Sequence, residues 1–69
     1  MKTIKDKQIC EILDISTSLW SLYKTEKKNI SYRMALKWQD RIGIDAGFVM
    51  ERERSIVVGA ITAFCLTRI

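Results

Sequence analysis

The sequence has no histidine, and its two cysteines, Cys10 and Cys65, lie near opposite ends of the chain. Histidine and closely spaced cysteine pairs supply most of the ligands that hold zinc and transition metals, so no metal site is expected. The chain also lacks a glycine-rich phosphate loop and a paired acidic motif. We therefore expect a protein that is not an enzyme and uses no cofactor.

No apolar stretch is long enough to cross a membrane. The stretch from Ile56 to Leu66 is well short of the about 20 apolar residues that a bilayer requires. The charged, polar N-terminus is also unlike a secretory signal. Cys10 and Cys65 both lie within apolar patterns, which is typical of reduced core residues. These features predict a cytoplasmic protein without membrane contact.

The length of 69 residues predicts a single domain spanning 1–69. A domain of this size buries only about 60% of its unfolded surface, and its core rarely supplies more than about 3–5 kcal/mol. Small domains commonly add disulfides, a metal or a partner chain. Because the first two are not expected here, we expect self-association.

Apolar residues recur at helical spacing along most of the chain, which predicts an all-α bundle of about four to five short helices. Asp14 is expected to break the first pattern, since aspartate tolerates the left-handed region, and Ser16 or Thr17 to cap the second helix. Asn29 or Ser31, Gly43 and Asp45 are the remaining expected helix boundaries. The predicted helices cover 6–13, 17–24, about 31–42, 46–50 and 55–69.

The C-terminal segment 55–69 is apolar on nearly every side and allows three interpretations. These are a membrane anchor, for which the segment is too short, a pair of strands turning at Gly59, and a helix buried on more than one side. We favour the helix, packed on its own domain with one side and on a second copy with the other. Gly59 and Ala63 would allow close approach, and the predicted dimer interface consists of Ile56, Ala60, Ile61 and Phe64.

The net charge of +4 is concentrated in residues 20–41, because positive and negative charges cancel in 1–19 and in 42–69. A local positive field of this kind is typical of phosphate binding, although a solvated loop is the simpler explanation for a charge run alone. The basic residues of this segment are Lys24, Lys27, Lys28, Arg33, Lys37 and Arg41, against Glu26 and Asp40.

The segment from about residue 6 to residue 25 resembles the helix-turn-helix of the Cro/C1-type (XRE-like, lambda-repressor-like) regulators of bacteria and phages. The matching features are a small residue in the first helix, a turn residue four positions later, an apolar residue, a polar cap and two hydrophobic anchors. They are Cys10, Asp14, Ile15, Ser16, Trp20 and Tyr23. The similarity extends over 7–50. It departs at Asp14, where the family usually has Gly, at Leu22, where it often has a long polar side chain, and at Gln39, where it usually has Ala. It also departs before Asp6, where the family's first helix is reduced.

The resemblance implies a sequence-specific transcriptional regulator, acting as a repressor, that binds operator DNA as a homodimer. The second helix would enter the major groove, while nearby basic residues would contact phosphates. The residues expected to contact bases are Ser16, Thr17, Ser18, Ser21, Leu22 and Thr25, and those expected at phosphates are Lys24, Lys27, Lys28, Arg33 and Lys37. Because the first set contains no Arg, Asn or Gln, we expect modest sequence specificity.

A protein-interaction module is the alternative function. An antitoxin or a small phage protein can use a helix-turn-helix as a scaffold, and segment 55–69 would then dock a protein partner. A regulator attached to a membrane through the same segment is a third, less favoured hypothesis because the segment is short.

Overall fold

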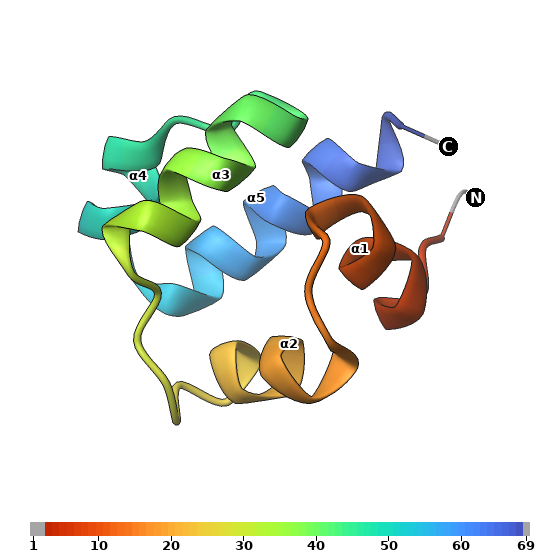
Figure 1. Cartoon of the computed structure of the whole chain (residues 1–69), viewed down its shortest axis with the longest axis horizontal. Helices are drawn as coiled ribbons and strands as arrows, with labels where there is room; N and C mark the ends of the chain where they lie inside the picture. Colours follow the sequence, from red (N-terminus) through yellow and green to blue (C-terminus); the bar gives the residue numbers. More distant parts are fainter. Residues whose placement is uncertain (1–2, 69) are drawn as a thin grey trace.

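The computed structural model describes residues 3–68, which contain five helices and no strand. The predicted all-α fold class is therefore confirmed. In Figure 1, α5 crosses the middle of the molecule, with α1 and α2 on one side and α3 and α4 on the other. The helices are α1 (Asp6–Leu13), α2 (Thr17–Lys24), α3 (Tyr32–Ile42), α4 (Ala46–Glu51) and α5 (Arg54–Leu66).

Three short polar side chains fix the starts of α2, α3 and α4. Each accepts a hydrogen bond from the backbone N–H three residues later, which satisfies a donor that has no partner within the helix. The N···O distances are 3.1 Å for Ser16, 3.1 Å for Ser31 and 2.9 Å for Asp45. Of the residues predicted as caps, Ser16 rather than Thr17 caps α2, Ser31 rather than Asn29 caps α3, and Asp45 caps α4.

Two residues in left-handed conformation end α1 and α3. Asp14 has φ 58° and ψ 50°, and Gly43 has φ 80° and ψ 10°. This backbone region is costly for most side chains but accessible to aspartate and glycine. The predicted turns at Asp14 and Gly43 are therefore confirmed.

The core is centred on two tryptophans. Trp20 of α2 and Trp38 of α3 are almost fully buried, and both cysteines are buried as free thiols. The packing residues come from every helix, so no helix stands apart from this core. The other buried residues are Ile9, Leu13, Tyr23, Ile30, Ala35, Ile42, Ile44, Ala46, Val49, Val57 and Ile61.

The segment predicted as a helix over 55–69 forms α5, which packs against α1 and α2. The predicted end at Ile69 lies outside the described residues. Val57, Ile61 and Cys65 are fully buried along one side of α5. The assignment of Ile61 to a dimer interface is therefore wrong, since this side chain is already enclosed by its own core.

Substitutions at two glycines distinguish the effect of backbone strain on stability from the effect of helix propensity. A Cβ added at either Gly43 or Gly59 meets no atom within 4 Å, so neither substitution creates a clash. Gly43→Ala should lower the free energy of unfolding by about 1 kcal/mol because of its positive φ. Gly59→Ala should raise it by about 0.5–1 kcal/mol, because alanine is favoured within a helix. Denaturant unfolding measures both changes in the free energy of unfolding. If the two substitutions changed it equally, the left-handed conformation at the end of α3 would be contradicted.

Candidate nucleic-acid interface

One face of α2 is exposed and rich in hydroxyl groups. All six residues predicted to contact bases are solvent-exposed, and Leu22 contributes the one large apolar side chain among them. Ser16 and Thr25 use their hydroxyls within the helix: Ser16 caps α2, and Thr25 Oγ1 donates to the Ser21 carbonyl at 2.9 Å. Among residues 3–68, the hydroxyls of Thr17, Ser18 and Ser21 make no hydrogen bond. These three groups are available to a ligand.

Asp6, at the start of α1, holds α2 in place through Trp20 and Lys24. Its carboxylate accepts a hydrogen bond from Trp20 Nε1 at 3.3 Å and forms an ion pair with Lys24. The hydrogen bond from Lys24 lowers the pKa of Asp6, an effect that partial burial opposes and the Trp20 N–H supports. Asp6 is thus ionised at neutral pH and links both turns of α2 to α1.

Arg54, the first residue of α5, also holds the C-terminal end of α2. Its Nη1 donates to the carbonyl oxygens of Tyr23 and Lys28, both at 2.9 Å. The guanidinium also lies 6.0 Å from the centre of the Tyr23 ring, which packs edge-on against Trp38 at 5.6 Å. Arg54 therefore fixes both the end of α2 and the loop that follows. Although Arg54 belongs to a run of four charged residues, 51–54, its guanidinium is bound to the protein and is not simply solvated.

Two further basic side chains secure the turn between α1 and α2. Lys37 of α3 donates to the Asp14 carbonyl at 3.2 Å and pairs with its carboxylate at 3.3 Å. Arg41 Nε donates to the Ile12 carbonyl at 2.7 Å, which satisfies an acceptor at the end of α1. These contacts place the turn firmly against α3.

The predicted phosphate-binding residues therefore fall into two groups. Lys24 and Lys37 are engaged in intramolecular ion pairs, whereas Lys27, Lys28 and Arg33 are exposed and form no ion pair with any described residue. Lys27 and Lys28 lie between α2 and α3 in the sequence. Figure 1 shows the loop that connects these two helices. Three unpaired cations thus lie on or just after this loop, close in sequence to the exposed hydroxyls.

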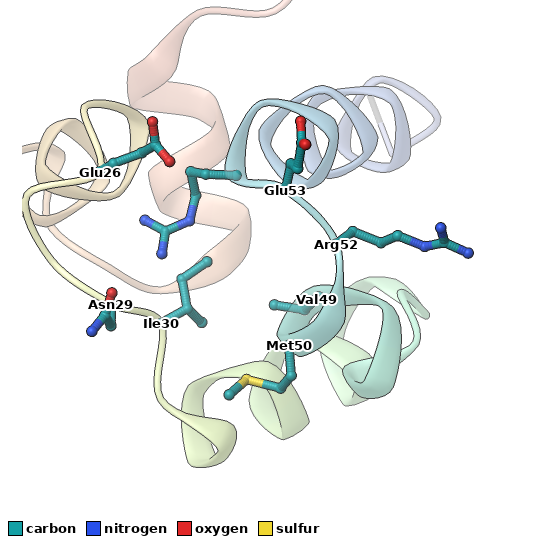
Figure 2. Close-up of a pocket in the computed structure, with 8 residues that line it drawn as sticks. Glu26, Asn29, Ile30, Val49, Met50, Arg52 and Glu53 are labelled. Carbon is teal, nitrogen blue, oxygen red and sulfur yellow. The ribbon is translucent and has the colours of Figure 1, made fainter.

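The cleft shown in Figure 2 lies between this loop and the junction of α4 with α5. It has a volume of about 460 Å³ and is lined by Glu26, Asn29, Ile30, Val49, Met50, Arg52, Glu53 and Arg54. Arg52 points away from it in Figure 2, and the Arg54 guanidinium already binds two carbonyls. With two glutamates in its lining and no free cation directed into it, this cleft is poorly suited to a phosphate, which makes the face of α2 the better candidate.

The two thiols are not arranged for chemistry. Burial raises the pKa of Cys10 and of Cys65, which keeps both in the unreactive protonated form. No group of three or more potential metal ligands occurs within 3–68. In the same part of the chain, no helix is long and apolar enough to cross a membrane.

Comparison with known proteins gave no match to a family model, to a curated protein or to a solved structure. The candidate site therefore rests on the residues and their geometry.

Asp6 and Arg54 are the two site residues that the sequence did not indicate. Both act on α2 across long sequence separations, 14 residues for the Asp6 contact with Trp20 and 31 for the Arg54 contact with Tyr23. A charged residue beside a helix start carries no local signal of such a partner. Only the three-dimensional packing identifies them.

Replacing Arg54 tests whether this side chain holds α2. Arg54→Ala should lower the free energy of unfolding by about 2 kcal/mol, because two carbonyls lose a charged donor. The neighbouring Arg52 is the matched control: it is exposed, with its guanidinium 5.8 Å from the centre of the Phe48 ring. Arg52→Ala should cost only about 0.5 kcal/mol. Similar losses for the two variants would contradict the role of Arg54.

Proposed function

We propose that this protein is a cytoplasmic DNA-binding transcriptional regulator, in which α1 and α2 form a helix-turn-helix and α2 is the recognition helix. One observation carries the proposal: the exposed hydroxyl face of α2 lies next to a loop with unpaired cations, and the helix is held in place by Asp6 of α1 and Arg54 of α5. A fixed helix can enter the major groove without losing further conformational freedom, and adjacent cations favour the phosphate backbone.

The two kinds of contact would have different roles. Thr17, Ser18 and Ser21 can each donate to or accept from a base edge, and Leu22 can contact a thymine methyl group. Lys27, Lys28 and Arg33 would neutralise phosphates, which orients the protein without reading sequence. Because hydroxyls discriminate bases less strongly than bidentate Arg, Asn or Gln, sequence-dependent DNA shape would add to specificity.

Regulation would follow from occupancy of an operator, which makes repression the simplest outcome. One recognition helix without a bidentate Arg, Asn or Gln offers limited affinity, so two copies on adjacent half-sites would be required. The absence of Arg, Asn and Gln from the exposed face of α2 also favours a second candidate, in which the bundle is a scaffold that binds another protein.

Selection from a random duplex library at near-physiological salt distinguishes these functions. An operator-binding dimer should enrich an inverted repeat with half-site centres about 10 bp apart. Ser18→Ala and Ser21→Ala should then relax the preference at individual base pairs, each by about 1 kcal/mol, while leaving the salt dependence of binding unchanged. Failure to enrich any sequence would leave α2 as a scaffold and favour the protein-binding alternative.

Charge reversal in the loop tests the phosphate contacts. Lys27→Glu combined with Lys28→Glu should weaken binding to every duplex by at least about tenfold and reduce the salt slope by about two units. Fluorescence anisotropy over a range of salt concentrations measures both quantities. Arg52→Glu is the control and is compared with Lys27→Glu alone, since each variant reverses one charge and Arg52 lies at an exposed position on the α4–α5 junction. If this control weakened DNA binding equally, the effect of the loop variant would be due to net charge and not to phosphate contacts of the loop.

A further inference from the structure

The exposed side of α5 carries a continuous apolar stripe. Ile56, Ala60 and Phe64 follow one another at four-residue spacing, which places them on one face of the helix. Ile56 is 49% exposed and Phe64 is 38% exposed, whereas the adjacent side of α5 is buried in the core. The stripe borders an apolar hollow of about 320 Å³ lined by Gly43, Ile44, Asp45, Phe48, Ala60 and Phe64. The single chain thus leaves both a projecting surface and a recess uncovered.

The stripe is symmetric about its centre. Ile56 lies four residues before Ala60 and Phe64 four residues after it, so the two large side chains are about 12 Å apart along the axis. Only small residues lie on the exposed side between them, namely Gly59, Ala60 and Ala63. Small residues at a crossing point let two helix axes approach to the short end of the usual 8–10 Å range.

Opposite charges flank the stripe. Glu53 lies seven residues before Ala60, and Arg68 lies eight residues after it. Both are exposed, and neither forms an ion pair with another residue of 3–68. An antiparallel neighbour with the same sequence would bring Glu53 to Arg68 at both ends, whereas a parallel neighbour would bring like charges together.

We propose that this stripe is the contact between two copies of the chain, with the two α5 helices packed antiparallel across Ala60. Ile56 of each copy then meets Phe64 of the other beside the apolar hollow, and Glu53 of each meets Arg68 of the other. Such an interface is isologous, because the same residues contribute from both sides. The contact shares no residue with the exposed face of α2 and does not depend on whether that face binds DNA.

Complementary charge reversals test both the partner and its orientation. Glu53→Arg places two positive charges at each end of the antiparallel pair, and Arg68→Glu places two negative charges there. Each variant alone should raise the dimer dissociation constant roughly tenfold. An equal mixture of the two should recover dimers, because each end of the mixed pair again holds one positive and one negative charge. Sedimentation equilibrium without DNA measures the mass, which for the unaltered chain should rise from 8.0 kDa to twice that value.

Apolar substitutions test the stripe itself. Ile56→Asp should raise the dissociation constant at least about a hundredfold, since it places a charge against Phe64 of the other copy in the apolar part of the interface. Leu36→Asp on α3 is the matched control, because Leu36 is also a large apolar side chain, 41% exposed. Thermal unfolding followed by circular dichroism confirms that each variant is folded.

Three outcomes would overturn the proposal. A chain that remains monomeric at every concentration would exclude a second copy as the partner. A mixture that stays as dissociated as its separate components would exclude the antiparallel arrangement. Dissociation by Leu36→Asp but not by Ile56→Asp would place the interface on α3.

Discussion

The structure depends on the burial of two aromatic side chains from one short helix. Trp20 and Tyr23 are 1% and 2% exposed, and they hold α2, which has only eight residues, against the other helices. An isolated helix of that length is not stable in water, so α2 exists because of its tertiary contacts. Trp20 Nε1 donates to Asp6 of α1, and the main-chain carbonyl of Tyr23 accepts from Arg54 of α5. The proposed recognition face is thus a product of the whole fold.

The basic side chains of the protein fall into two groups according to whether they bind other parts of the same chain. Lys24, Lys37, Arg41 and Arg54 bind carboxylates or carbonyls of the protein itself. Lys27, Lys28 and Arg33 have no such partner among the described residues. The positive charge of segment 20–41 is therefore partly structural, and the part free to attract a phosphate lies in and just after the loop that follows α2.

The helix boundaries were predictable because caps act locally. Ser16 and Asp45 bond to a backbone N–H three residues away, and Asp14 and Gly43 adopt a conformation that their own side chains permit. Contacts across the fold were not predictable. A helix that is apolar on nearly every side does not reveal which stripe faces the core, so Ile61 was placed in an interface although it is fully buried. The role of Arg54 was missed because its acceptors are 26 and 31 residues away.

Both proposed surfaces depend on α5. Its first residue, Arg54, binds the carbonyls at the end of α2 and in the basic loop, and the apolar stripe begins two residues later at Ile56. One rigid helix therefore connects the proposed dimer contact to the proposed recognition helix. A bent or mobile connection would let two recognition helices vary in separation, which would weaken selection for half-sites about one DNA turn apart. With Arg54 in place, pairing two α5 helices would also fix the distance between two α2 helices, so that self-association sets which operator spacing the protein can bind.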